Sequence, residues 1–382
     1  MTNWKTYKLG DIGRIVTGKT PKTSILENYG GNIPFLTPSD DLSGKHSPAT
    51  AKTLTQQGLL EVKNCLLPAN SVCVSCIGSD LGKVVKVIQP TVTNQQFNSI
   101  IPSDDFDTDF VYYLMTIVGK QLNYLSKTST AVPIINKTLF SNVEVQIPPL
   151  EEQRRIAGIL GAIDDKIENN RRINTNLELQ AQALFEEWCE SCSKTITIKE
   201  FADNILDYTP NANSKVVLLN SSDVTQGLFA ELPLVDNVNL KGQFKKRFQK
   251  DDILYSEIRP RNKHYAYCYF DSDRYIASTR LIVLRGKKEK IVSNTLLYQY
   301  LISQTVFEEF TLKTETRSGT FPQGNYQDLS SIVVPYSDNQ KEIAGSLDVI
   351  YEEIWSNYKE NETLATLRDT LLPKLMNGEI KL

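Results

Sequence analysis

Residues 147–184 read IPPLEEQRRIAGILGAIDDKIENNRRINTNLELQAQAL and return, 187 residues later, as VPYSDNQKEIAGSLDVIYEEIWSNYKENETLATLRDTL at 334–371. Identical pairs include Gln153/Gln340, Ile156/Ile343, Ala157/Ala344, Gly158/Gly345, Leu160/Leu347, Ile163/Ile350, Ile167/Ile354, Asn170/Asn357, Asn174/Asn361, Leu177/Leu364 and Leu184/Leu371. A repeat at a module-sized interval indicates two copies of one structural unit.

The apolar residues of each copy have the spacing of a helix that packs against another helix. Their steps alternate between four and three residues over four heptads, which is typical of a coiled-coil seam. We expect the first helix to run from about Glu152 to Cys189, after a pair of prolines, over roughly 55 Å. The seam comprises Ile156, Leu160, Ile163, Ile167, Asn170, Asn174, Leu177 and Leu184, and its repeat comprises Ile343, Leu347, Ile350, Ile354, Asn357, Asn361, Leu364 and Leu371.

Each helix would bury its seam most simply against its own repeat. Antiparallel packing about a pseudo-twofold axis brings Asn170 and Asn174 near Asn357 and Asn361. Buried asparagines lower stability but fix register and orientation. The alternative is that these asparagines face solvent at a bulge in the seam; we favour the central polar layer.

The segments before each helix form a second, weaker repeat. Matching segments are LGDIGRIVTGKTP (9–21) with IKEFADNILDYTP (198–210), IPFLTPSD (33–40) with VVLLNSSD (216–223), and NSVCVSCIGSDLGK (70–83) with DDILYSEIRPRNKH (251–264). Both copies have short alternating strands between turn residues and one helical stretch. The sequence therefore predicts an α+β fold with two mixed α/β globular domains and two long antiparallel helices. The expected boundaries are 1–149 for the first domain, 150–192 for the first helix, 193–337 for the second domain, and 338–382 for the second helix and tail.

Charge is distributed unevenly along the chain. The 382 residues carry a net charge of −3, with 40% hydrophobic and 23% charged residues, as in globular proteins of two or three domains. Residues 241–290 hold fourteen Lys and Arg against six Asp and Glu, whereas residues 151–190 hold five against nine. Basic modules on an acidic scaffold are typical of proteins that bind polyanions, although a solvated charged surface would look the same.

Cysteine spacing and hydropathy narrow the protein class. Six cysteines without dense spacing argue against a secreted disulfide scaffold. The pairs Cys73/Cys76 and Cys189/Cys192 could form a zinc site, but we favour ordinary thiols because neither histidine is near in sequence. No signal-peptide core and no run of 18 apolar residues are found. We expect a cytoplasmic protein without a membrane span.

This layout resembles the specificity subunit of type I restriction–modification systems. The resemblance covers the whole chain, and its specific carriers are IPPLEEQRRIAGILGAIDDKI (147–167), QKEIAGSLDVI (340–350) and TLLPKLMNGEIKL (370–382). The module openings LGDIGRIVTGKTP and YSEIRPRN are also similar to those of the family.

The resemblance implies a non-catalytic adaptor. Each module would recognise one half of a bipartite sequence in double-stranded DNA, and the helices would space the modules and dock two methyltransferase subunits. Those subunits would bind S-adenosylmethionine and methylate adenine, and separate restriction and translocation subunits would use ATP and Mg²⁺. This chain would bind no cofactor and no metal of its own, and would work in the cytoplasm of a prokaryote.

The resemblance assigns no DNA-contacting residues, so the candidates come from side-chain chemistry. Arginine suits guanine edges, asparagine and glutamine suit adenine, and lysine suits phosphates. In the second module the candidates are Arg259, Arg261, Asn262, Lys263 and His264, with Arg317 and Ser318 in a hydroxyl-rich loop. In the first module they are Lys19, Lys45, His46, Lys83, Asn94, Gln95 and Gln96, with Lys127 and Ser129 in the matching loop. Any of these residues could instead be an ordinary turn or the solvent face of a strand.

One motif points to another function. GRIVTGKT (13–20) fits the phosphate-loop pattern, with Gly13, Gly18, Lys19 and Thr20 at the required spacing. Pro21 follows at once, and the repeat partner ADNILDYT (202–209) keeps neither the second glycine nor the lysine, so we interpret the segment as an opening strand and turn. A self-sufficient methyltransferase is disfavoured because no Asn/Asp-Pro-Pro-aromatic motif occurs. A stand-alone sequence-specific DNA-binding protein remains the main alternative.

Overall fold

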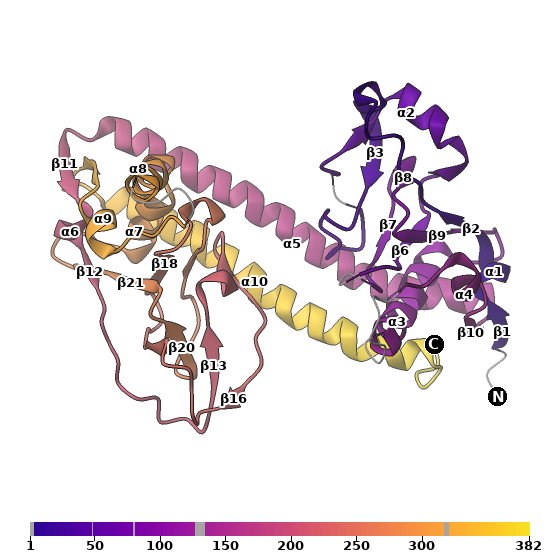
Figure 1. The fold of residues 1–382 in the computed structure, drawn as a ribbon. Coiled ribbons are helices and arrows are strands. Elements are labelled where there is room, and N and C mark those ends of the chain that lie inside the picture. Colours follow the sequence, from indigo (N-terminus) through magenta and orange to yellow (C-terminus); the bar gives the residue numbers. More distant parts are fainter. Residues whose placement is uncertain (1–3, 48, 79–80, 127–133, 317–320) are drawn as a thin grey trace. The chain divides into compact units, whose positions relative to one another are not determined.

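The computed structural model describes residues 4–47, 49–78, 81–126, 134–316 and 321–382, and the chain divides into two compact units. The first unit is Met1–Asn169 with Glu360–Leu382, and the second is Asn170–Lys359. Each unit therefore contains one globular module and one half of each long helix (Figure 1).

The first module is built on two small sheets and a two-stranded ribbon. One sheet is antiparallel, in the order β2 (Gly13–Thr17), β9 (Phe97–Pro102), β6 (Val72–Ser75) and β7 (Val84–Lys86). The other has the order β4 (Thr53–Leu54), β3 (Tyr29–Leu36), β8 (Thr91–Thr93) and β5 (Leu66–Leu67), and β3 pairs parallel with β8. The ribbon pairs β1 (Lys5–Lys8) with β10 (Glu144–Ile147). The helices are α1 (Leu9–Ile12), α2 (Gln56–Glu61), α3 (Thr108–Ser126) and α4 (Lys137–Ser141), with short 3-10 turns at Leu26–Asn28 and Lys63–Cys65.

The second module repeats the two sheets and the ribbon of the first and adds one short hairpin. Its antiparallel sheet has the order β12 (Ala202–Asn204), β21 (Leu281–Gly286), β18 (Ile253–Ser256) and β19 (Tyr265–Tyr267). Its mixed sheet has the order β16 (Val235–Asp236), β13 (Lys215–Leu219), β20 (Tyr275–Ser278) and β17 (Phe244–Lys246), and β13 pairs parallel with β20. The ribbon is β11 (Lys194–Thr197) with β22 (Val333–Tyr336), and β14 (Val224–Thr225) forms a hairpin with β15 (Leu228–Phe229). The helices are α6 (Ile198–Phe201), α7 (Asn294–Ile302), α8 (Gln304–Glu315) and α9 (Tyr326–Ser330), with 3-10 turns at Ser221–Asp223 and Pro260–Asn262.

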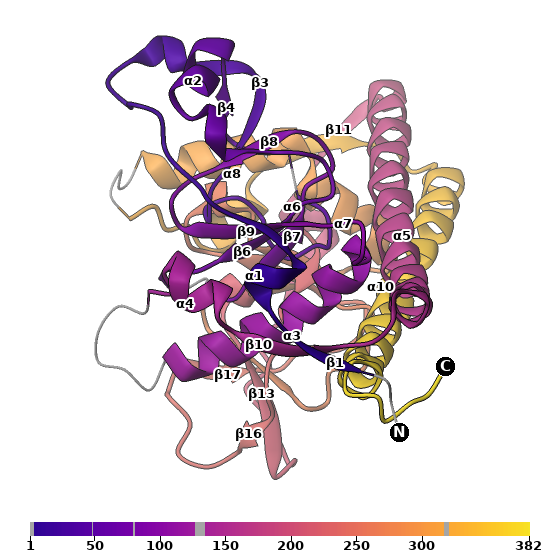
Figure 2. The same ribbon diagram turned by 90° about the vertical axis from the view of Figure 1, so that its right-hand side faces the viewer.

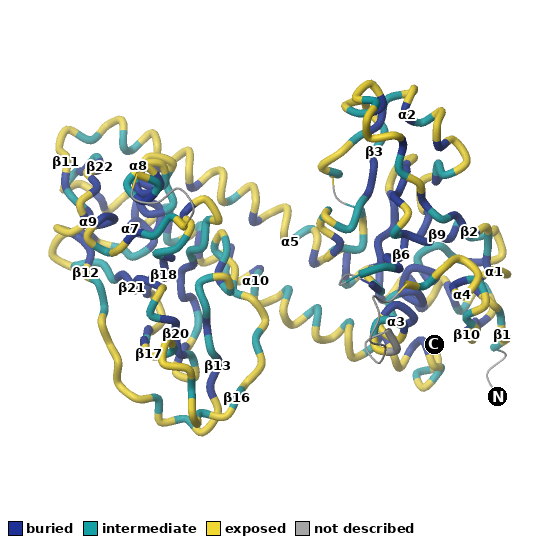
Figure 3. The backbone as a smooth tube through the Cα atoms, viewed as in Figure 1, coloured by how far each residue is buried: buried dark blue, intermediate teal, exposed yellow. Residues whose placement is uncertain are grey.

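Apolar residues on both faces of the central strands create the core of each module. All four residues of β6 (VCVS) and of β18 (ILYS) are buried, because one face packs under a helix and the other faces the mixed sheet. Helix α3 covers β6 and β7 (Figure 2). Figure 3 shows the buried backbone along β6, β9 and α3, and along β18 and β21 in the other unit. The predicted fold class is confirmed: two mixed modules, one repeat and a pair of packed long helices.

The long helices are α5 (Leu150–Ser191) and α10 (Lys341–Met376), and they run antiparallel within each unit. In the first unit, Lys166 Nζ lies 3.1 Å from the Glu360 carboxylate and Arg368 lies 2.8 Å from Asp164. In the second unit, the Trp188 indole nitrogen donates to the Asn339 carbonyl at 3.3 Å. Residues later in α5 thus meet residues earlier in α10.

The seam residues differ in how deeply they are buried. Buried members are Ile156, Leu160, Ile167, Asn170, Asn174, Ile343, Leu347, Ile354 and Asn357. Partly buried members are Ile163, Leu177, Ile350, Asn361, Leu364 and Leu371. The amide nitrogen of Asn357 donates to the Asn174 side-chain oxygen at 2.8 Å, and Asn174 donates to the Ile354 carbonyl at 3.1 Å. These asparagines therefore lie inside the helix pair.

Leu184 does not belong to the seam, contrary to the heptad prediction. Its side chain is 39% exposed, and the neighbouring Phe185 is buried in its place. An α-helix with 3.6 residues per turn drifts by about 20° per heptad against a strict seven-residue repeat. After four heptads, Phe185 follows Ala181 by four residues and faces the core.

Residues 13–20 begin with a strand, as predicted, and the phosphate-loop alternative is wrong. Gly13–Thr17 form strand β2 in antiparallel register with β9, and the backbone nitrogen of Lys19 donates to the Thr93 carbonyl at 2.9 Å. A phosphate loop needs a helix directly after it. Gly18 has another role, because a Cβ there would lie 2.0 Å from the Asn94 carbonyl oxygen. The glycine permits close packing of two strands.

Candidate nucleic-acid interface

Three segments converge at one end of the antiparallel sheet of the second module. The backbone of Glu257 donates to the Arg280 carbonyl at 3.0 Å and accepts from Gly324 at 2.8 Å. The backbone of Arg259 donates to the Pro322 carbonyl at 2.9 Å. The turn after β18 (257–264), the β20–β21 turn (279–280) and residues 321–324 together form what we call the loop edge of this module.

The first module has the same loop edge. The backbone of Cys76 donates to the Gln96 carbonyl at 2.7 Å and accepts from Ile135 at 3.0 Å. The isolated bridge Ile77–Ile134 matches Ile258–Gln323 in the second module. The described parts of this loop edge are the turn after β6 (76–78 and 81–83), the β8–β9 turn (94–96) and residues 134–135.

The loop edge of the second module presents cations from a tight turn. Arg259 and Lys263 flank the 3-10 turn Pro260–Asn262, with φ values of 47° and 52°, both in the left-handed region. Such backbone conformations cost about 1–2 kcal/mol for non-glycine residues, so the surrounding contacts must hold them in place. Glycine is absent from this turn, which therefore keeps side chains at every position.

The two left-handed residues of this turn are Arg259, with φ of 47°, and Lys263, with φ of 52°. Their side chains lie on aromatic rings: the Arg259 guanidinium is 5.3 Å from the ring centre of Phe321, and Lys263 Nζ is 5.2 Å from that of Phe307. Arg261 forms a two-point ion pair with Glu315, at 2.5 and 2.8 Å, and its side chain stays 70% exposed. Asn262 is exposed between them. The cations are therefore oriented but open to solvent.

His264, the last residue of this turn, contacts the neighbouring hairpin β14–β15. Its Nδ1 lies 2.9 Å from the Val224 carbonyl oxygen and 3.0 Å from the Thr225 hydroxyl, so the ring holds hairpin β14–β15 against the turn. The ring is only partly exposed. This geometry favours a supporting role for His264 over direct contact with DNA.

The loop edge of the first module is rich in amides rather than cations. The side-chain oxygen of Asn94 accepts from the Gln96 backbone at 3.0 Å, and its amide nitrogen donates to the Gln96 side chain at 2.8 Å. Asn94 is buried and thereby shapes the turn, whereas Gln95 is exposed and Gln96 is partly exposed. Thr20 donates to Gln95 at 2.7 Å, so the exposed Lys19 lies beside the same turn. Lys83 is exposed on the neighbouring segment.

Lys45 is not available for DNA, contrary to the prediction. Its side chain is 8% exposed, and its Nζ lies 3.1 Å from the Asp109 carboxylate and 5.4 Å from the ring centre of Tyr113. Lys86 shares the same carboxylate. Partial burial, together with the ammonium groups of Lys86 and Lys45, lowers the pKa of His46 below its usual value, so His46 adds no positive charge at neutral pH.

Lys127, Ser129, Arg317 and Ser318 lie outside the described residues. The remaining candidates fall into two groups. Lys19, Lys83, Gln95 and Gln96 come together on the loop edge of the first module, and Arg259, Arg261, Asn262 and Lys263 come together on that of the second. Lys45 and His46 belong to neither loop edge.

Sequence reasoning missed Arg280. It is exposed in the β20–β21 turn, directly beside the backbone of Glu257. The available signal was the short turn STR (278–280), which precedes a buried strand as NQQ (94–96) does in the first module. A single arginine among fourteen basic residues in that region gave no reason to select it from composition.

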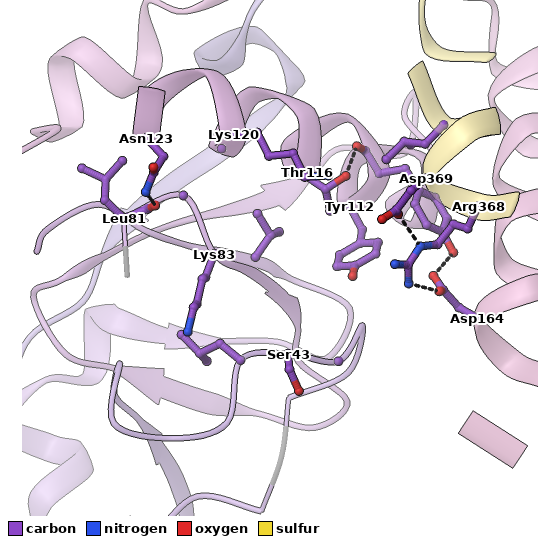
Figure 4. Close-up of a pocket in the computed structure, with 17 residues that line it drawn as sticks. Ser43, Leu81, Lys83, Tyr112, Thr116, Lys120, Asn123, Asp164, Arg368 and Asp369 are labelled. Carbon is purple, nitrogen blue, oxygen red and sulfur yellow. Dashed lines mark hydrogen bonds and ion pairs between the residues drawn. The ribbon is translucent and has the colours of Figure 1, made fainter. Parts of the chain in front are cut away.

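A cavity of about 480 Å³ in the first unit marks where the first module meets its part of the long helices (Figure 4). Tyr113 donates to the Asp164 carboxylate at 2.6 Å, and Arg368 donates to the same carboxylate at 2.8 Å and to Asp369 at 3.0 Å. Burial alone would lower the pKa of Arg368, but hydrogen bonds to Asp164 and Asp369 raise it, so the guanidinium stays charged.

The equivalent junction of the second unit centres on an uncharged pair, beside which Ser293 and Thr295 donate to the Asp348 carboxylate of α10 at 2.7 and 2.5 Å. Tyr351 of α10 donates to the Gln299 side chain of α7 at 2.6 Å, where the first unit has Asp164 of α5 and Tyr113 of α3. In each unit a buried hydrogen bond thus joins the module to the long helix that follows it in the chain, α3 to α5 and α7 to α10. These junctions position the modules and leave the loop edges free for a ligand.

The described residues show no features typical of a metal site, of reactive cysteines or of a membrane-spanning helix. No group of three or more His, Cys, Asp or Glu side chains lies close enough to hold a metal ion within those ranges. Burial raises the pKa of Cys73 to about 12 and that of Cys76 to about 11, so both remain thiols. No helix in the described part combines the length and apolar character needed to cross a membrane.

Comparison with known proteins gives one consistent family. The sequence model of the family described as "Type I restriction modification DNA specificity domain" matches residues 1–179 and again residues 195–365. The type I restriction enzyme MjaIX specificity subunit of Methanocaldococcus jannaschii is 25% identical over 415 residues, covering 99% of this chain and 94% of that protein. The HindI specificity subunit of Haemophilus influenzae is 36% identical over 163 residues, covering 42% of this chain and 35% of that protein.

A solved structure shares the fold. The crystal structure of a type I restriction–modification S subunit from M. genitalium superposes with a TM-score of 0.60 at 16% identity, covering 98% of this chain and 96% of that one. At this identity the likeness concerns the fold alone.

Proposed function

Because the chain belongs to the type I restriction–modification DNA specificity family, whose model matches it twice, we propose that each module recognises one half of a bipartite DNA sequence. The observation that carries this proposal is the loop edge, which occurs once in each module with the same backbone hydrogen bonds and with different exposed side chains. A shared scaffold with different reading groups is what recognition of two different half-sites requires.

The two loop edges suit DNA in chemically different ways. Arg259, Arg261 and Lys263 provide positive charge that attracts the phosphate backbone, and arginine also forms two hydrogen bonds with a guanine edge. Gln95 and Gln96 offer amides that match the adenine edge, with Lys19 beside them for a phosphate. Base contacts specify sequence, while phosphate contacts fix position.

Replacing Arg259 with alanine is expected to affect one half-site only. Arg259 belongs to a single loop edge, so the complex should lose affinity and also lose sensitivity to scrambling of the half-site read by the second module. If Arg259 contacts a phosphate, the slope of log affinity against log salt should also fall by about one. Fluorescence anisotropy with DNA in which each half-site is scrambled in turn measures both effects.

Arg274→Ala is the matched control for Arg259→Ala. Arg274 is also exposed in the second module, but it precedes strand β20, at the opposite end from the loop edge. The Arg274→Ala complex should bind DNA with the affinity and the half-site preferences of the wild type. Equal loss of sensitivity at both half-sites in Arg259→Ala would contradict the assignment of one module to one half-site.

The long helices supply docking sites for two methyltransferase subunits in this proposal. Gly158 in α5 and Gly345 in α10 are exposed at matching positions of the repeat, and a Cβ at either would meet no other atom of the chain within 4 Å. A glycine inside a helix costs about 1 kcal/mol relative to alanine. Close approach of a partner's backbone would explain why both helices keep one, and a shallow hollow surrounds Gly345, with Val349 69% exposed beside it.

Tryptophan at either glycine is expected to block one copy of the partner. Gly158→Trp and Gly345→Trp should each purify with one methyltransferase subunit, and the double variant with none, as measured by native mass spectrometry of the co-expressed complex. Gln180→Trp, at another exposed position of α5, should retain both subunits. Two bound copies in both single variants would contradict these docking sites.

The chemistry of the complex belongs to its partners in this account. The methyltransferase subunits would bind S-adenosylmethionine and methylate adenine, and the restriction subunits would use ATP and Mg²⁺, in the cytoplasm of a prokaryotic cell. The alternative, a DNA-binding protein that acts alone, differs in one observable way. It would bind its full target with the same affinity whether or not a methyltransferase is present.

A further inference from the structure

The two loop edges can be aligned residue by residue from their hydrogen bonds. In the sheets, Ser75 pairs with Phe97 and Ser256 pairs with Leu281, so Phe97 and Leu281 are equivalent. Counting back one residue makes Gln96 equivalent to Arg280. The parallel pairs Leu36–Thr93 and Leu219–Ala277 lead to the same alignment from the other end of the turn.

Local contacts of the two turns support this equivalence. The Gln96 backbone donates to the side chain of Asn94 at 3.0 Å, and the Arg280 backbone donates to the side chain of Ser278 at 3.3 Å. The carbonyl of each accepts from the residue after β6 or β18, which is Cys76 or Glu257. The chain therefore places a carboxamide and a guanidinium on one backbone position in two modules.

Hydrogen bonds to residues 243 and 246 hold the turn that carries Arg280 in place. The backbone of Thr279 donates to the Gln243 carbonyl at 2.8 Å, and the buried Lys246 ammonium donates to the Leu281 carbonyl at 2.6 Å. The Arg280 side chain is exposed, and no ion pair among the described residues includes it. Burial raises the pKa of the neighbouring Glu257 carboxyl, and the charges of Lys246 and Arg280 oppose this rise. A turn whose backbone is already held in place loses little entropy on binding.

We propose that Gln96 and Arg280 are position-matched base-reading residues, Gln96 for an adenine in the first half-site and Arg280 for a guanine in the second. The carboxamide of glutamine bonds adenine N6 and N7, and the guanidinium of arginine bonds guanine O6 and N7. Because the two residues occupy the same backbone position, each reads the base at the same place relative to its module. This inference rests on the proposed function, since it assumes that the loop edges face DNA.

The test exchanges the two readers in the full complex with its methyltransferase subunits. Arg280→Gln should reduce the preference for one guanine by roughly tenfold or more, in one half-site, and raise the preference for adenine there. Gln96→Arg should produce the reverse change in the other half-site. Methylated-adenine mapping over a library of randomised half-sites measures both, and Arg274→Gln serves as the control that leaves both half-sites unchanged.

The outcomes separate this inference from the proposed function. If the wild type methylates a bipartite sequence and Arg280→Gln methylates the same sequence with unchanged preferences, position-matched reading is wrong and the proposed function stands. If Arg280→Gln lowers methylation equally at all sequences, Arg280 contacts the backbone rather than a base, and the inference also fails. If the wild-type complex recognises no bipartite sequence, the proposed function itself fails.

Discussion

Asp164→Ala is expected to lower the free energy of unfolding of the first unit by about 3 kcal/mol. The carboxylate is 9% exposed and accepts from both Tyr113 and Arg368. Its removal leaves a buried hydroxyl without its acceptor and a partly buried guanidinium without its main counter-charge. Removing one partner of a buried pair is more costly than removing both, because the remaining group stays desolvated.

Two variants control this measurement. Asp165→Ala changes the next residue of α5, which is exposed, and should shift stability by less than about 0.5 kcal/mol. Asp164→Asn keeps the shape and one acceptor oxygen, so it should fall between the wild type and Asp164→Ala. Urea denaturation followed by circular dichroism measures the three differences. An Asp164→Ala protein as stable as Asp165→Ala would mean that the junction does not hold the first module on its helices.

Asn357→Leu is expected to destabilise the second unit by about 2 kcal/mol, and a second substitution is expected to restore most of the loss. The single change leaves the buried side-chain oxygen of Asn174 without the donor that lies 2.8 Å away. Asn174→Leu combined with Asn357→Leu removes both polar groups from the helix pair. Replacing both partners of a buried hydrogen bond by apolar groups is close to neutral.

A double-mutant cycle from urea denaturation tests this pair. The expected result is a coupling energy of at least about 1 kcal/mol between the two positions. Thr175→Leu, on the exposed face of α5, is the control for a leucine added elsewhere on the helix. Independent, additive losses at the two positions would show that the asparagines do not act as one layer.

Much of the fold followed from periodicity. The alternation of three- and four-residue steps predicted a helix from Glu152 to Cys189, and the structure has Leu150–Ser191. The internal repeat predicted two modules of one fold, and their strand orders match. Leu184 was misplaced because a heptad count ignores the drift of a straight helix, which only the packed partner reveals.

The candidate site was harder to predict because burial and register are properties of the assembled chain. Lys45 is a residue type that commonly binds phosphate, but in the folded chain its ammonium forms an ion pair with Asp109, which lies 64 residues later in the sequence. Asn94 is a residue type that suits the adenine edge, but its side chain forms hydrogen bonds with the backbone and side chain of Gln96 and so stabilises the turn. Arg280 became a candidate only when strand pairing aligned it with Gln96, since the two turns share only their place before a buried strand and none of their residues.

The most direct test of the account is a map of methylated adenines in DNA exposed to this chain together with its methyltransferase subunits. If two modules recognise a bipartite target, every methylated adenine lies in one of two short sequences separated by a fixed gap. Exchanging residues 193–337 for the corresponding module of a relative should then change only one of the two. A single uninterrupted recognition sequence, or a change in both halves after the exchange, would contradict recognition of a bipartite target by two separate modules.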